Sequence, residues 1–323
     1  MKNEIRRDYI LEKYSIVAAN TNLSYKNFAQ MHRLASDPAG CIFCSHNVHS
    51  LPSIIEEVQN MQKEWKIRVV PNINESVTPE GNPILRTDNV YFTWAQAYGR
   101  EEIIIESPNH YEDFGDLHVD IIELNIKKYI QRINVLEKTP YVAYVALFKN
   151  QGFNAGSHTT HSHSQLMTMS VVPTSIQKEK DALEKFKREF HFCPHCDLIN
   201  TEKKSLRRIF ETNTFVSFSP YSSDFPFEVR IYPKKHLGKL SQLSDQEVLD
   251  LANTFKTILS KLNTLNYPAY NIVYITAPID GGDFHFYIRI IPRLSKRAGF
   301  ELVTDTMVNP ISPEDAAKFY RGE

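Results

Sequence analysis

The sequence predicts an α+β fold made of two tandem copies of one unit, each an antiparallel sheet with helices packed on it, related by a pseudo-two-fold axis. A Cys-x-x-Cys pair occurs once in each half of the chain. In both halves this pair precedes two strand-like segments, a helix-like segment and a strand that carries a histidine. Such a replayed order is the signature of an internal repeat.

The spacing of the histidines supports the repeat. His161 lies 51 residues after His110, and His285 lies 49 residues after His236. A helix and a loop lie between the two histidines of each pair, so agreement this close is hard to obtain by chance. We therefore predict two domains, residues 1–174 and 175–323.

The elements of the first half follow from periodicity and from turn residues. Apolar residues recur at helical spacing over 54–65 and over 117–136, which predicts two helices. Strands are expected over 5–20, 67–72 and 103–110, the last two closed by Pro-Asn and by a Ser-Pro-Asn-His turn. An apolar run over 141–148 precedes a further strand that is expected to begin near His161.

The second half repeats this order. Strands are expected over 215–220, 227–236 and 284–293, and a helix over 245–262. The polar, lysine-rich segment 175–187 links the halves and is predicted to be a helix as well.

Composition limits the classes of function. The 323 residues are 42% hydrophobic and 23% charged, with a net charge of -1, which gives no electrostatic reason to bind nucleic acid or an anionic membrane. No apolar run approaches the length of a membrane-spanning helix, and the charged N-terminus lacks the apolar core of a signal peptide. We expect a cytoplasmic protein.

Two groups of residues have the composition of a tetrahedral zinc site, with two thiolates and two imidazoles each. The predicted ligands are Cys41, Cys44, His110 and His161 in the first half, and Cys193, Cys196, His236 and His285 in the second. A single all-cysteine site, a redox dithiol and unligated reduced cysteines are the alternatives. Iron is an alternative to zinc at the second site. The repeat favours two separate zinc ions per chain.

The segment 158–165 carries the candidate reactive group. On a strand that begins near His161, alternation places His161, His163 and Gln165 on one face. Four protein ligands close a zinc site, so the chemistry is expected at an adjacent group. A neutral imidazole held by that strand is a nucleophile for phosphorus, and a glutamine amide can stabilise charge on a phosphate oxygen. The alternative is that all three histidines of the segment bind metal or line a core.

The motif at residues 161–165 resembles the His-Pro-His-Gly-Gln signature of galactose-1-phosphate uridylyltransferases, a branch of the histidine triad superfamily. Ser162 and Ser164 stand where the family usually has Pro and Gly. The resemblance extends over nearly the whole chain and implies two histidine-triad-like repeats. It also implies that His163 is nucleotidylated, and that the second half, with Tyr287 at the matching position, is catalytically silent.

The resemblance implies roles for further residues. Asn150 and Ser157 match positions that contact the substrate phosphates, and they join His163 and Gln165 as the predicted catalytic group. Asn72 and Arg68 lie on the segment that resembles the nucleotide-binding strand. Lys296 belongs to a segment that resembles the C-terminal substrate segment of the family.

We therefore predict a nucleotidyltransferase that moves a nucleoside monophosphate from a nucleotide sugar to a phosphorylated acceptor through a covalent histidine adduct. Gln165 in place of a third histidine favours transfer over hydrolysis. The alternatives are a phosphorylase or hydrolase of ADP-sugars or dinucleoside polyphosphates, and a non-catalytic, zinc-stabilised nucleotide-binding protein. Relatives are commonly dimers, so a homodimer is a possible assembly.

Overall fold

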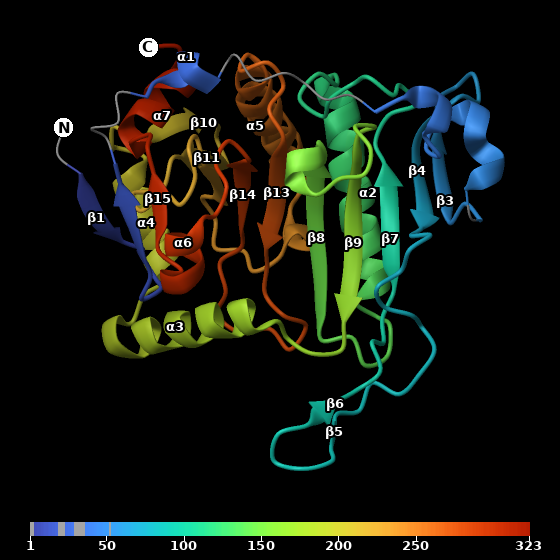
Figure 1. The fold of residues 1–323 in the computed structure, drawn as a ribbon, viewed down its shortest axis with the longest axis horizontal. Coiled ribbons are helices and arrows are strands. Elements are labelled where there is room, and N and C mark those ends of the chain that lie inside the picture. The colour runs from blue at the N-terminus through green and yellow to red at the C-terminus, as the bar shows by residue number, and fades with distance from the viewer. Residues whose placement is uncertain (1–2, 19–22, 29–35, 52) are drawn as a thin grey trace.

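A single large antiparallel sheet organises the molecule (Figure 1). The structure, a computed structural model, describes residues 3–18, 23–28, 36–51 and 53–323. Within these residues the sheet has ten strands. Their order across the sheet is β10 (Arg208–Glu211), β11 (Phe215–Phe218), β12 (Val229–Pro233), β14 (Tyr287–Pro292), β13 (Tyr270–Ile275), β8 (Tyr144–Gln151), β9 (His163–Met169), β7 (Glu101–Ile105), β4 (Trp65–Pro71) and β3 (Glu56–Gln59).

The two halves of the sheet have the same strand order. If the five strands of each half are numbered along the chain, both halves read first, second, third, fifth, fourth from the edge of the sheet to its centre. From one edge it is β3, β4, β7, β9, β8, and from the other it is β10, β11, β12, β14, β13. The halves meet where β8 pairs with β13, with Gln151 opposite Tyr270. This order favours the predicted repeat. The division after residue 174 stays a prediction, although the linking helix α3 (Thr174–Phe190) begins there.

Two long helices cover one face of the sheet and form the main core with it. They are α2 (Val119–Leu136) and α5 (Asp245–Asn263), which confirm two of the predicted helices. A capping box between Ser244 and Glu247 fixes the start of α5. Both helices contribute fully buried side chains to one apolar cluster with the strands, among them Ile126 and Phe255.

Smaller elements surround the large sheet. A three-stranded sheet joins the ends of the chain through β1 (Glu4–Arg7), β2 (Tyr14–Val17) and β15 (Met307–Asn309). A two-stranded hairpin of β5 (Arg86–Thr87) and β6 (Thr93–Trp94) projects away from the body (Figure 1). The other helices are α1 (Tyr25–Phe28), α4 (Pro194–Glu202), α6 (Gly299–Thr304) and α7 (Pro313–Arg321). No helix among the described residues is both long and apolar enough to cross a membrane.

The helix predicted over residues 54–65 was wrong. The chain there forms β3, a turn and the start of β4, with Glu57 opposite Arg68. Asn60 makes the turn, because its side-chain oxygen accepts hydrogen bonds from the backbone N–H groups of Gln62 and Glu64. Met61, which completed the helical pattern, is 98% exposed at the tip of this turn. Local turn chemistry therefore outweighed the apolar spacing.

Candidate active site

Strand β9 carries the predicted reactive residues and lies between β7 and β8. Alternation along the strand works as predicted. His163 and Gln165 line a pocket on one side. Ser162 and Ser164 are buried on the other side, where both donate hydrogen bonds to Glu106.

The pocket beside β9 has a volume of about 590 Å³. It brings together five of the predicted catalytic and substrate-binding residues, which are Asn72, Asn150, Ser157, His163 and Gln165. These come from segments separated by up to 93 positions in the chain. Among the described residues that line the pocket, neither Arg68 nor Lys296 is present.

His163 has the geometry of a neutral nucleophile. It is 4% exposed, and its Nδ1–H donates to the carbonyl oxygen of His161 at 2.8 Å. Nε2 then carries the lone pair, and it lies 3.5 Å from the side-chain nitrogen of Gln165. Burial, reinforced by the nearby Lys149 ammonium, lowers the pKa of His163 to about 4. The imidazole is therefore uncharged at neutral pH.

Asn150, near the end of β8, and Ser157, in the loop that follows β8, line the pocket together with His163. The side-chain oxygen of Asn150 accepts from the amide of Asn271 at 2.8 Å, so the amide nitrogen of Asn150 is left to donate. Gly156 adopts a φ of 90°, in the left-handed region that favours glycine. This turn carries the chain into Ser157, whose hydroxyl donates to the carbonyl oxygen of Thr159 at 2.5 Å.

Glu101 is a pocket residue that sequence reasoning missed. Its carboxylate is 5% exposed and accepts from the Asn72 amide at 2.7 Å and from the backbone N–H of Ser76 at 2.9 Å. These bonds hold the segment after β4 against β7. The two acidic residues that begin the otherwise apolar strand β7 were the available signal, because buried carboxylates need partners.

Arg68 and Lys296 lie outside the pocket. Arg68 forms an ion pair with Glu57 at 2.5 Å, and its guanidinium lies 4.3 Å from the ring centroid of Trp65. These contacts occupy the side chain on the β3 side of β4. Lys296 lies in the segment between β14 and α6. Substrate-binding roles for both residues stay predictions.

The first cluster of cysteine and histidine forms beside His163. Cys41, Cys44, His110 and His161 are all buried, and their ligand atoms lie within 4.8 Å of one another. Sγ of Cys44 lies 3.3 Å from Nδ1 of His110 and 3.6 Å from Nδ1 of His161. Ligands on a tetrahedral zinc ion would be about 3.5 Å apart for sulfur and nitrogen, given the usual bond lengths.

The outer nitrogens of this cluster also fit a metal site. Nε2 of His161 donates to the carbonyl oxygen of Ser107 at 2.8 Å, and Nε2 of His110 donates to that of Ser36 at 2.9 Å. Both bonds select the tautomer with a free lone pair on Nδ1, as in metal-ligating histidines. The residues present therefore fit zinc in charge, distance and tautomer.

The second cluster has the same design but is more open. Cys193, Cys196, His236 and His285 converge in the same way. Sγ of Cys196 lies 3.5 Å from Nδ1 of both histidines. Nε2 of His285 donates to the carbonyl oxygen of Pro233 at 2.9 Å, and Nε2 of His236 lies 3.1 Å from Asp283. The structure thus brings together both predicted ligand sets, and it keeps the two cysteine pairs in separate sites.

Comparison with known protein families decides the family. The model described as galactose-1-phosphate uridyl transferase, N-terminal domain, matches residues 3–173. The chain belongs to the galactose-1-phosphate uridylyltransferase family. The resemblance seen in the motif at residues 161–165 is thereby confirmed. A model for a domain of unknown function matches residues 114–319.

Relatives within this family cover most of the chain. ADP-glucose phosphorylase of Arabidopsis thaliana is 31% identical over 88% of this chain and 82% of its own. Galactose-1-phosphate uridylyltransferase of Thermotoga maritima is 26% identical over 81% of this chain and 86% of its own. A crystal structure of an Arabidopsis thaliana ADP-glucose phosphorylase with bound ADP-glucose superimposes with a TM-score of 0.84, at 27% identity, covering 100% of this chain and 99% of that one.

In this member of the galactose-1-phosphate uridylyltransferase family, Tyr287 occupies the position in the second half that matches His163. Tyr287 is buried and stacks on Tyr232 with ring centroids 4.9 Å apart. Its hydroxyl donates to Glu179 at 3.2 Å. Burial, with Glu179 next in effect, raises the pKa of Tyr287 well above its ordinary value. This supports the prediction that the second half is catalytically silent.

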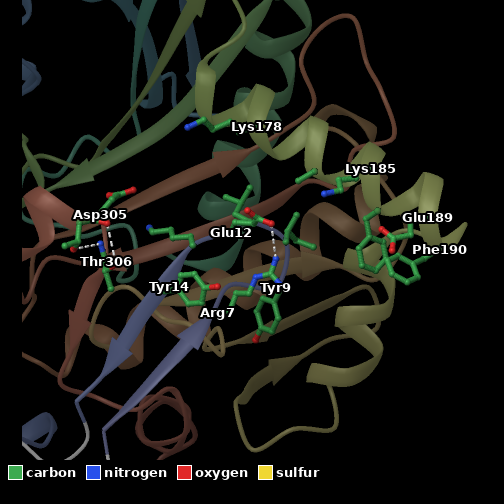
Figure 2. Close-up of a pocket in the computed structure, with 16 residues that line it drawn as sticks. Arg7, Tyr9, Glu12, Tyr14, Lys178, Lys185, Glu189, Phe190, Asp305 and Thr306 are labelled. Carbon is green, nitrogen blue, oxygen red and sulfur yellow. Dashed lines mark hydrogen bonds and ion pairs between the residues drawn. The ribbon is translucent and has the colours of Figure 1, made fainter.

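A second cavity, of about 830 Å³, lies between the β1–β2 hairpin, α3 and the loop before β15. Figure 2 shows Arg7 from β1 and Lys178 and Lys185 from α3 around it, together with the aromatic rings of Tyr9, Tyr14 and Phe190. None of the predicted site residues is among the described residues that line it. The pocket beside His163 therefore remains the candidate active site.

Proposed function

We propose that this protein is a nucleotidyltransferase that uses inorganic phosphate to split an ADP-sugar, through an adenylylated His163. The observation that carries the proposal is Nε2 of His163, which has a free lone pair and faces a pocket lined by four other polar residues of the predicted site. A buried, neutral imidazole is suited to attack phosphorus.

The reaction has two displacements. In the first, Nε2 of His163 attacks the α-phosphorus, the bond from that phosphorus to the bridging oxygen breaks, and the sugar 1-phosphate leaves. In the second, an oxygen of inorganic phosphate attacks the same phosphorus, the phosphorus–nitrogen bond breaks, and ADP leaves. The first displacement exchanges a phosphoanhydride bond for a phosphorus–nitrogen bond, and the second exchanges that bond for the phosphoanhydride of ADP. The oxidation state of phosphorus does not change, so no redox partner is needed.

The neighbouring residues stabilise charge and fix the donor. Gln165, beside Nε2, donates a hydrogen bond to a non-bridging oxygen as charge develops there. The amide of Asn150 and the Ser157 segment contact the phosphates, and Asn72 holds the nucleoside. Each of these groups is fixed by hydrogen bonds within the protein, which lowers the reorganisation required during transfer.

We also propose zinc in both Cys₂His₂ clusters, because their distances and tautomers fit it. With four protein ligands each, the ions are structural and fasten loops to the sheet. Cys41 and His161 of the first cluster lie directly beside the pocket and His163.

The choice of ADP-sugar and phosphate rests on the ADP-glucose phosphorylase similarity. Exchange of uridylyl groups between sugar phosphates is the second candidate, and the similarity to the Thermotoga maritima uridylyltransferase favours it. The two candidates share the nucleophile and differ in the base and the acceptor.

An intact-mass experiment separates the candidates. The protein is incubated briefly with ADP-, UDP- or GDP-glucose without acceptor, and its mass is measured. We expect an added AMP with ADP-glucose, and release of ADP when inorganic phosphate follows. An added UMP, discharged by galactose 1-phosphate and not by phosphate, would favour the second candidate. No adduct with any of the three donors would contradict the covalent mechanism.

A further inference from the structure

A buried ion pair lies directly beneath the nucleophile strand. Lys149 on β8 and Glu106 just after β7 are 1% and 0% exposed, and Nζ of Lys149 lies 2.6 Å from Oε2 of Glu106. Burial opposes ionisation of the carboxyl, but the ammonium and nearby hydroxyls outweigh it and lower the pKa of Glu106. The lowered pKa favours the carboxylate form of Glu106 beside Lys149.

The contacts of this pair converge on three successive residues of the nucleophile segment. Nζ of Lys149 donates to the hydroxyl oxygen of Ser162 at 2.9 Å and to the carbonyl oxygen of His163 at 3.0 Å. The carboxylate of Glu106 accepts from the hydroxyls of Ser162 and Ser164, at 2.5 Å each. A hydroxyl from α2, that of Tyr129, also donates to Glu106.

Stability alone explains this arrangement poorly. Burying two charges carries a large desolvation penalty, and apolar side chains of similar volume often stabilise a protein as well or better. Another buried pair, Arg132 with Glu102, links α2 to β7 and donates no hydrogen bond to the segment 161–164 among the described contacts. The contacts of Glu106 and Lys149 are instead concentrated on the backbone and hydroxyls that flank His163.

We propose that Glu106 and Lys149 are positioning residues for His163, acting through Ser162 and Ser164, an inference that rests on the proposed function. Through its hydrogen bonds to Ser162, Ser164 and the His163 carbonyl, the pair fixes the backbone of residues 162–164 from the side of β9 that faces away from the pocket. That backbone presents the His161 carbonyl to Nδ1 of His163 at 2.8 Å, and this bond leaves the lone pair on Nε2 aimed at the pocket. The pair touches no substrate, so it changes the rate of transfer and leaves nucleotide affinity unchanged.

The test removes the two hydroxyls and keeps the charges. In the double variant Ser162→Ala/Ser164→Ala, the rate constant for adduct formation at saturating ADP-glucose should fall roughly 10- to 100-fold, the scale of a small misplacement of a reacting group. The affinity for AMP, which has no leaving phosphate, should be unchanged by calorimetry. The single variant Ser164→Ala gives the same comparison if the double variant does not fold.

The matched control is Ser217→Ala/Ser222→Ala. Both serines are buried, and their hydroxyls donate to the carbonyl oxygens of Phe210 at 2.9 Å and Arg6 at 3.0 Å, outside the candidate active site. The control should lose a comparable amount of thermal stability and keep the wild-type adduct rate. A wild-type rate in the test variant, or an equal loss of rate in the control, would overturn the positioning role.

A second readout separates this inference from the proposed function. Nitrogen-15 NMR of the His163 ring reports whether Nδ1 carries the proton. We expect the Nδ1–H form in the wild type and the control, and a mixture of tautomers in the test variant. If the wild type forms no adduct, the proposed function fails, and the ring spectra alone then decide: an unchanged tautomer in the test variant refutes the positioning role.

Discussion

The variant His163→Ala is expected to form no nucleotidyl adduct and to lose turnover by about 10⁴-fold or more, as enzymes do when a covalent nucleophile is removed. Among the described residues that line the pocket, the other histidine is His158, which is exposed, and His161 outside the lining directs its Nδ1 toward Cys41 and Cys44. The measurements are intact mass after incubation with ADP-glucose and steady-state release of glucose 1-phosphate.

His191→Ala is the matched control for this prediction. His191 is exposed and ends α3 in the left-handed conformation, away from the pocket residues. It should keep both adduct formation and turnover, and both variants should retain their zinc, since neither histidine belongs to a ligand cluster. An adduct that persists in His163→Ala would place the nucleophile elsewhere and contradict the mechanism.

The parts of the site that the sequence predicted are those defined by local pattern. Strand alternation placed His163 and Gln165 on one face, and the repeat brought each Cys-x-x-Cys pair to the correct histidines. Both inferences need only the chain direction and the period of the element. The same kind of reasoning failed at residues 54–65, because one asparagine side chain reversed the chain within a seemingly helical pattern.

Contacts between segments that are far apart in the chain could not be predicted from sequence periodicity. Glu106 and Lys149 are 43 positions apart and meet because β7 and β8 flank β9. The choice of partner for Arg68 likewise depended on β3, which the sequence had suggested as a helix. Strand β13 was also missed, although Ile272 and Tyr274 alternate as buried residues within it.

Loss of the metal is expected to have different consequences at the two clusters. Wild-type protein should contain two zinc ions per chain, and Cys44→Ser and Cys196→Ser should contain one each. Since the ligands join segments far apart in the chain, each loss should destabilise the fold by something on the order of 4 kcal/mol, a fall in Tm of roughly 10 °C for a chain of this size. Metal analysis and thermal unfolding measure both effects.

Only the first loss should also reduce adduct formation. His161 belongs to the first cluster, and its carbonyl oxygen accepts the hydrogen bond from Nδ1–H of His163, so release of His161 should loosen the position of His163. The second cluster includes His285, whose matching neighbour is the stacked and hydrogen-bonded Tyr287 rather than a reactive group. Cys196→Ser should therefore keep the wild-type adduct rate at a temperature where it is folded. Equal losses of rate in the two variants would show that zinc acts on the overall fold and not on the placement of His163.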